Sequence, residues 1–193
     1  MLLLIFGLML FFSAHSLSMV RPAWRAQAIE RAGEVPYQFG YALVSLAGVV
    51  LIVLGYGAAR AADPVLIYQP PVGLRHVALL LMLPVFPLVL AAYMPGRIQR
   101  TLKHPMLIGV LFWALAHLLA NGTLADVLLF GSFLVWAAAD LASLLRRRAP
   151  AVPGAPPGKR NDLIAVVAGL ALYVAFILFL HKWLIGIPPI AMG

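Results

Sequence analysis

The sequence has no cysteine among its 193 residues, and charged side chains make up only 10% of it. The absence of cysteine excludes disulfides, thiolate metal ligands, iron–sulfur clusters, cysteine nucleophiles and covalent haem attachment through C-x-x-C-H. A soluble domain usually has about 25% charged residues, so the composition also excludes a water-soluble globule. The chemistry that remains open depends on histidine, carboxylate or backbone groups.

Carboxylates are scarce as well. Glutamate occurs only at Glu30 and Glu34, both in one predicted loop, so acid–base catalysis by paired carboxylates is not expected. The chain contains no H-E-x-x-H, G-x-S-x-G, Walker or G-x-G-x-x-G pattern. The sequence therefore gives no support to the zinc protease, serine hydrolase and nucleotide-binding classes.

Hydrophobic residues make up 64% of the sequence and gather in long runs. A helix needs roughly 20 apolar residues to cross a bilayer, and six runs are predicted to cross: 1–20, 39–56, 77–94, 106–120, 124–145 and 163–184. The first is predicted to be a retained helix rather than a signal peptide, because its first cation, Arg21, follows the apolar run. We expect an all-α fold, a polytopic membrane helical bundle of about six transmembrane helices, with residues 1–193 forming one transmembrane domain.

Three local features are expected to shape this bundle. Pro84 and Pro87 remove backbone donors and should kink the third helix, which membrane helices tolerate when neighbours cover the freed carbonyls. The Asn-Gly-Thr sequence at 121–123 predicts a tight turn that joins the fourth and fifth helices into a hairpin. The segment 150–158, rich in proline, glycine and alanine, is predicted to be a flexible surface loop.

The distribution of charge predicts the topology. The formal net charge is +8, but the basic residues lie between apolar runs rather than on a tail, so the expected partner is an anionic lipid bilayer and no nucleic acid. With six crossings, 11 of the 14 lysines and arginines fall on one face of the membrane. Because the cytoplasmic face carries the excess of cations, both termini are predicted to lie outside the cytoplasm.

Two histidines lie inside apolar runs, where a polar side chain is costly and usually functional. His15 lies about 21 Å along the first helix, and His117 lies near the non-cytoplasmic end of the fourth. Two such histidines on different helices are what bis-histidine haem ligation requires. One alternative is that neutral imidazoles hydrogen-bond between helices and hold the bundle together. Another is a proton relay, for which Asp126 and Asp140 are the available carboxylates.

His104 is a third candidate, at the start of the fourth helix before Pro105. With Arg97, Arg100 and Lys103 it forms an electropositive collar suited to phosphate, carboxylate or haem propionates, or to lipid headgroups. If the helices cross a hydrocarbon core of ~30 Å, His15 and His104 match in depth better than His15 and His117 do. His15 and His117 are kept as the predicted pair, with His104 in reserve.

Four motifs carry a resemblance to a known family. They are Leu-Phe-Phe-Ser-Ala-His-Ser at 10–16, Lys-His-Pro-Met at 103–106 followed by Gly109, Trp-Ala-Leu-Ala-His at 113–117 with Asn-Gly at 121–122, and Trp-Leu-Ile-Gly-Ile-Pro-Pro at 183–189. Through them nearly the whole chain resembles the NnrU family of bacterial membrane proteins, whose relatives include the plant zeta-carotene isomerase. The resemblance implies a multi-pass protein of the bacterial inner (cytoplasmic) membrane with both termini in the periplasm.

The resemblance also implies a function and a cofactor. Bacterial members are associated with denitrification through expression of nitrite and nitric oxide reductases. The plant relative is a haem b enzyme, a cis-trans isomerase of an apolar polyene, and its two axial histidines fall on the motifs matched here by His15 and His117. His15 and His117 are therefore the implied cofactor-binding residues, and the depth argument keeps His104 as the reserve. The relative has a cysteine at the position of Ala114, so ligand switching through that cysteine cannot occur in this chain.

Two other functions are weighed against a haem protein. The first is a cofactor-free membrane scaffold or assembly factor, in which the histidines only join helices. The second is a membrane methyltransferase-like protein, which the His-Pro pair before a helical hairpin suggests. That class expects acidic and arginine-bearing motifs near the C-terminus, whereas residues 163–193 supply one lysine and no carboxylate.

Overall fold

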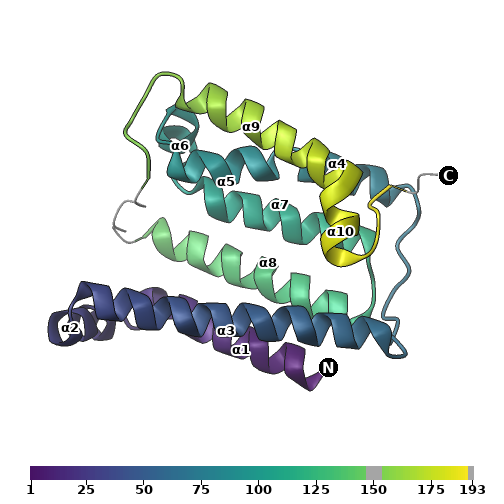
Figure 1. Ribbon diagram of the computed structural model, residues 1–193, viewed down its shortest axis with the longest axis horizontal. Helices are drawn as coiled ribbons and strands as arrows, with labels where there is room; N and C mark the ends of the chain where they lie inside the picture. Colours follow the sequence, from purple (N-terminus) through teal and green to yellow (C-terminus); the bar gives the residue numbers. More distant parts are fainter. Residues whose placement is uncertain (147–153, 191–193) are drawn as a thin grey trace. The chain divides into compact units, whose positions relative to one another are not determined.

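The computed structural model describes residues 1–146 and 154–190 (Figure 1). The protein is 79% helical, and within these residues no β-strand is formed beyond an isolated bridge between Leu66 and Thr123. In this part of the chain, five helical stretches are long and apolar enough to cross a membrane: Leu2–Val20, Glu34–Ala61, Leu74–Tyr93, Leu124–Leu144 and Asn161–Ile185. A shorter apolar helix, Pro105–Ala120, supplies the sixth predicted crossing. The all-α fold with about six membrane helices is confirmed.

The elements follow one another in this order: α1 (Leu2–Val20), α2 (Pro22–Ala32), α3 (Glu34–Ala61), α4 (Leu74–Met82), α5 (Val85–Tyr93), α6 (Arg97–Leu102), α7 (Pro105–Ala120), α8 (Leu124–Leu144), α9 (Asn161–Ala175), the π-helical turn η1 (Phe176–Leu180) and α10 (His181–Ile185). The apolar runs did not predict α2 and α6, because both are short and carry several polar residues. The chain divides into two compact units, and each is described by itself.

Unit 1 consists of Met1–Pro70 and Asn121–Arg146, and so contains α1, α2, α3 and α8. Its main contact is between α1 and α3, which run side by side (Figure 1). Glycines allow this close approach: a Cβ added to Gly7 would lie 2.7 Å from the backbone nitrogen of Ile52, and one on Gly48 would lie 2.9 Å from that of Phe11. Any larger residue would push the two helices apart.

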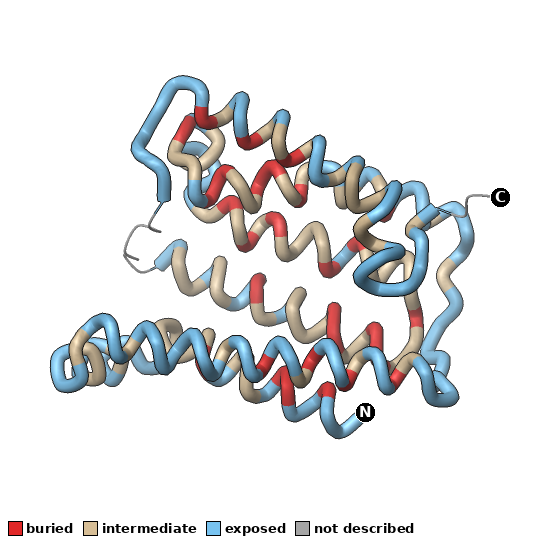
Figure 2. The backbone as a smooth tube through the Cα atoms, viewed as in Figure 1, coloured by how far each residue is buried: buried red, intermediate tan, exposed pale blue. Residues whose placement is uncertain are grey.

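The outer surface of α3 is apolar. Val35, Phe39 and Val53 are each more than half exposed, and Figure 2 shows exposed residues along most of this helix. Monomeric soluble proteins rarely expose apolar surface of this extent. The exposed apolar helices fit a membrane protein with a lipid bilayer around it; the inner membrane and the periplasmic termini stay predictions.

The turn at 121–123 is anchored within unit 1. Backbone N–H groups of Ile67 and Tyr68 donate to the Gly122 carbonyl at 2.9 and 3.1 Å, and Leu124 N–H donates to the Val65 carbonyl at 2.8 Å. The predicted turn therefore exists and ends α7 before α8 begins. The two helices belong to different compact units, so their packing as a hairpin stays a prediction.

Unit 2 consists of Pro71–Ala120 and Arg147–Gly193, of which 154–190 is described after the gap. In it, α5 packs against both α7 and α9. The predicted kink is confirmed, since α4 ends at Met82 and α5 begins at Val85, on either side of Pro84. At the break Leu83 N–H donates to the Leu80 carbonyl instead of that of Leu79, and the Tyr173 hydroxyl donates to the Leu79 carbonyl at 2.8 Å. A neighbouring helix thus covers the freed carbonyl, as membrane helices require.

The predicted loop 150–158 lies partly outside the described residues. Its described part, 154–158, is held against the end of α5: Ala155 N–H donates to the Tyr93 carbonyl at 2.8 Å and Gly158 N–H to the Pro95 carbonyl at 3.4 Å. A side chain at Gly154 would overlap the Tyr93 carbonyl. This part of the segment is anchored rather than loose, because its small residues let its backbone reach the corner after α5.

Candidate functional site

His15 lies on α1 among aromatic side chains of unit 1. The ring of Phe11 stacks on it, with centroids 3.9 Å apart and an interplanar angle of 22°. Tyr41 of α3 and Trp136 of α8 lie against it at 5.2 and 5.9 Å. The Trp136 indole also donates to the Ser16 hydroxyl at 3.1 Å, which ties α8 to α1 beside the histidine. The imidazole is half-buried, and it is held from three helices.

A carboxylate on α8 acts on His15 from across unit 1. Asp140 acts electrostatically on both His15 and Tyr41. It lies four residues after Trp136, and so on the same face of α8. A positive or iron-bound imidazole at His15 would find partial compensation there.

His117 lies on α7 in unit 2, three residues before the end of that helix. Its ring is half-buried and lies 5.2 Å from the ring of Trp113, at an angle of 51°. Ala114 is fully buried. The position that holds a cysteine in the plant relative is therefore packed inside unit 2.

The two histidines each make the same kind of hydrogen bond, to the backbone carbonyl four residues earlier in their own helix. His15 Nδ1 lies 2.9 Å from the Phe11 carbonyl, and His117 Nδ1 lies 2.8 Å from the Trp113 carbonyl. A carbonyl oxygen can only accept, so Nδ1 carries the proton in both neutral rings and Nε2 holds the lone pair. Iron and other metals bind imidazole through such a lone pair, and a backbone carbonyl is a common partner for the opposite ring nitrogen. Both residues thus have the tautomer of an Nε2 ligand.

His104 lies directly before α7 and is half-buried. Its backbone carbonyl accepts from Ile108 N–H at 3.3 Å, and its N–H donates to the Leu102 carbonyl at 2.7 Å. The preceding residue, Lys103, has a φ of 61°, an unusual conformation for a residue other than glycine. The backbone of His104 thus belongs to the tight turn that precedes α7.

The three predicted ligands fall into different parts of the molecule. His15 belongs to unit 1, whereas His104 and His117 lie at opposite ends of α7 in unit 2. No group of three or more histidine, aspartate or glutamate side chains that would hold a metal ion occurs within 1–146 and 154–190. A haem site formed by one histidine from each of two helices does not require such a group. The assignment of His15 and His117 as that pair stays a prediction.

A buried polar cluster in unit 1 was not predicted from the sequence. Asp126 is 4% exposed. Its carboxyl accepts from the Tyr56 hydroxyl at 2.6 Å, and from the backbone N–H and hydroxyl of Thr123 at 2.9 and 2.6 Å. The Thr-x-x-Asp spacing is a capping-box signal that could have identified the start of α8. The contact with Tyr56 joins residues 70 positions apart, and no local pattern predicts it.

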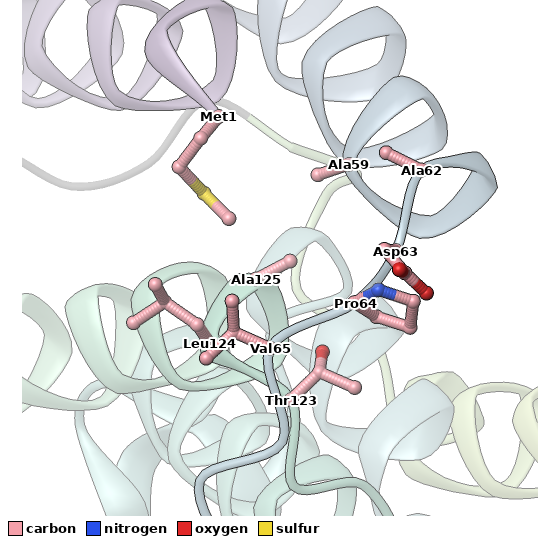
Figure 3. A pocket seen from close by; sticks show the side chains of 9 residues that line it. All are labelled: Met1, Ala59, Ala62, Asp63, Pro64, Val65, Thr123, Leu124 and Ala125. Carbon is pink, nitrogen blue, oxygen red and sulfur yellow. The ribbon is translucent and has the colours of Figure 1, made fainter.

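A cavity of about 250 Å³ opens beside this cluster, within unit 1 (Figure 3). It lies between the start of α1, the end of α3 and the start of α8, and most of its lining is apolar. The lining residues are Met1, Ala59, Ala62, Asp63, Pro64, Val65, Thr123, Leu124 and Ala125. None of the three candidate histidines is among them, so the cavity and the predicted ligand site are separate features.

One family of known proteins matches the chain. The family is described as NnrU protein, and its model matches residues 3–189, which includes both compact units. This match confirms the resemblance that the four sequence motifs indicated. No curated protein and no solved structure matches the chain.

Proposed function

The chain belongs to the NnrU family, and from this premise we propose that it binds haem b with His15 and His117 as the axial ligands. The observation that carries the proposal is that each ring makes a hydrogen bond from Nδ1–H to the carbonyl four residues earlier in its own helix. That bond presents Nε2 as the lone-pair nitrogen in each ring. His104 is the reserve ligand.

The residues present fit such a group. Haem b needs no covalent attachment to cysteine, and two neutral imidazoles are sufficient to hold its iron. At His15, Phe11 keeps the ring in one orientation by stacking on it, while Tyr41 and Trp136 offer flat apolar surface around it. At His117, Trp113 supplies both the accepting carbonyl and an aromatic neighbour. When bound, haem would supply a redox-active iron in an apolar setting.

The role proposed for this site is redox-linked. Two activities agree with the family and with the apolar surroundings of both rings: isomerisation of an apolar polyene, and support of nitrite and nitric oxide reductase-linked denitrification. The scarcity of carboxylates within the apolar runs favours redox chemistry over acid–base catalysis. Alanine at position 114 cannot ligate iron, so His117 is the ligand proposed on α7.

Optical spectroscopy on the full chain tests the proposal. Protein expressed with ample haem and purified in detergent should show Soret and alpha bands that shift on reduction. H15A and H117A should each abolish or shift these bands, because each removes one axial ligand. H76A is the matched control, since His76 is an exposed histidine at the start of α4, and its spectrum should match that of the unchanged protein.

Two results would contradict the proposal. Bands that are absent from protein made with ample haem would remove the enzymatic and the respiratory roles together. Bands that survive both H15A and H117A would show that the ligands were misassigned, and H104A then tests the reserve.

The rival function is a cofactor-free membrane scaffold or assembly factor. It is favoured at His15 by the contacts of the ring with Tyr41 of α3 and Trp136 of α8, which join three helices of unit 1. H15Q and H117Q separate the two cases. Glutamine hydrogen-bonds between helices but does not replace an imidazole on iron, so a scaffold should retain its activity and a haem protein should lose its spectrum.

A further inference from the structure

One corner of unit 2 is built by two adjacent side chains at the start of α9. The carboxyl oxygens of Asp162 accept from the backbone N–H groups of Arg97 at 2.7 Å and Ile98 at 3.0 Å. The amide of Asn161 donates to the carbonyls of Pro95 and Pro156 at 3.0 and 2.9 Å. The two Asp162 bonds hold the start of α9 against α6, and the Asn161 bonds tie it to the residues that precede each helix. Figure 1 shows the two elements together.

The corner brings cations together. Five exposed basic side chains come from the joined segments and are called the cationic patch: Arg97, Arg100, Lys103, Lys159 and Arg160. Arg97 and Arg100 act electrostatically on Asp162. Lys159 and Arg160 precede Asp162 by three and two positions. The patch is therefore formed by tertiary contacts between two segments about 60 residues apart.

The positive charge of the patch is not neutralised inside the described part of the chain. Within 1–146 and 154–190 none of the five side chains forms an ion pair or lies over an aromatic ring. Other arginines differ, since Arg25 lies 5.7 Å from the ring of Tyr37 and Arg60 lies 5.6 Å from the ring of Tyr56. The single negative charge of Asp162 offsets at most one of the five positive charges, so the patch keeps an excess of positive charge.

Apolar side chains lie next to these cations in the chain. Tyr93, Leu102 and Leu163 are 46%, 37% and 64% exposed. A tyrosine and aliphatic groups beside lysine and arginine are typical of the boundary between headgroups and acyl chains. The combination suits a ligand that has both a phosphate and a hydrocarbon part.

We propose that the cationic patch binds the headgroup phosphate of an anionic phospholipid, whose acyl chains lie along the adjacent apolar side chains. A free phosphate would use the cations but not Tyr93, Leu102 or Leu163. The predicted topology places the patch on the cytoplasmic face, where anionic lipid attracts basic segments. The site does not depend on the haem proposal, because neither predicted axial ligand belongs to it.

Lipid retention by the full chain tests this site. The protein is reconstituted in phosphatidylcholine with a fraction of phosphatidylglycerol, mildly delipidated, and analysed by native mass spectrometry. R100Q/K159Q is compared with R75Q/K182Q, and each pair removes one exposed arginine and one exposed lysine from unit 2. Retained phosphatidylglycerol should fall by about tenfold in the first pair and stay near the original value in the second. Equal losses in both pairs, or none in the first, would overturn the proposal.

The D162A variant distinguishes a lipid site that depends on the Asp162 contacts from a nonspecific attraction of lipid to positive charge. The change removes a negative charge, so a diffuse electrostatic attraction would retain more phosphatidylglycerol. A site that depends on the corner should retain less, because α6 loses its contact with α9. Circular dichroism and thermal unfolding report whether the variant is folded, and D162N, which keeps one acceptor, replaces it if it is not. More phosphatidylglycerol on a folded variant would contradict the proposal.

Two further measurements identify the chemical class of the ligand. Inorganic phosphate at the concentration of the lipid should not displace phosphatidylglycerol, and displacement would overturn the assignment to a lipid. The haem spectrum of R100Q/K159Q should equal that of the unchanged protein. A changed spectrum with normal lipid retention would assign the patch to haem propionates instead.

Discussion

The two compact units both bring helices together at glycines but differ in whether those helices are continuous, and each carries a histidine with the same hydrogen bond. In unit 1, two unbroken helices, α1 and α3, approach closely at glycines such as Gly48. In unit 2, the helices are interrupted at Pro84 and at the π-helical turn η1, and the Tyr173 side chain covers a carbonyl freed at the proline break. His15 and His117 nevertheless make the same hydrogen bond to the carbonyl four residues before them.

This comparison distinguishes interactions within one helix from those that depend on how the helices pack. A bond to the carbonyl at i−4 lies within one turn of the same helix, so it is available wherever the helix and the side-chain rotamer allow it. The same tautomer is therefore open to both histidines, whichever unit surrounds them. What the units contribute is the degree of burial and the aromatic groups that limit rotation of each ring.

The largest change in the free energy of unfolding is expected at the contact between α1 and α3 in unit 1. A Cβ on Gly55 would lie 2.7 Å from the Cα of Leu4, whereas nothing lies within 4 Å of a Cβ on Gly57. G55A should lower the free energy of unfolding by about 1–3 kcal/mol, because α1 and α3 must separate. G57A, the matched control, should leave it unchanged or raise it by roughly 0.5–1 kcal/mol. Denaturant titration in detergent measures both, and equal stabilities would show that the helices do not depend on this contact.

A smaller loss of stability is expected when the hydroxyl of either of two tyrosines, one in each unit, is removed. Y56F removes a hydrogen bond to the buried Asp126 carboxyl, and Y173F removes one to the Leu79 carbonyl. Bonds to a carboxylate are stronger than those between neutral groups, so we expect losses of about 2 and about 1 kcal/mol in the free energy of unfolding. Y93F is the control, because the exposed Tyr93 hydroxyl makes no hydrogen bond within the described residues. The reverse order of losses would indicate that the proline break matters more than the buried carboxyl.

The smallest effect concerns the orientation of a ring. F11L removes the ring stacked on His15 but keeps the accepting carbonyl. The Nδ1–H tautomer should persist in the ¹⁵N imidazole spectrum of the cofactor-free chain, while the haem bands of the loaded protein should broaden or shift slightly. F12L is the control, since Phe12 packs on Phe133 and Trp136 instead. A lost Nδ1–H signal in F11L would show that the tautomer depends on stacking and not on the helix.

Much of the architecture could be predicted from local pattern. The apolar runs predicted the membrane helices, and Pro84 predicted the break between α4 and α5, because a residue without an N–H cannot continue the ladder. The polar helices α2 and α6 were missed, since hydropathy runs do not detect short amphipathic segments. The predicted loop was misjudged at 154–158, because its glycines and prolines permit docking as readily as flexibility.

The candidate site was predictable in part. His15, His104 and His117 were identified because a histidine within or beside an apolar run is conspicuous, and their motifs carried the family resemblance. The polar cluster at Asp126 was not identified as a unit, although Thr123 and Asp126 show a capping signal, because Tyr56 reaches it from another helix. The anchored corner at Asp162 was missed for the same reason.

The sequence by itself determined which segments are helical and apolar and where proline interrupts them. These follow from interactions within a few residues, namely side-chain hydropathy and missing backbone donors. Only the tertiary structure decided that Tyr173 covers the Leu79 carbonyl, that Tyr56 meets Asp126 and that Asp162 gathers the cations of two segments. Each of those contacts joins residues more than 60 positions apart, and their pairing depends on how whole helices pack.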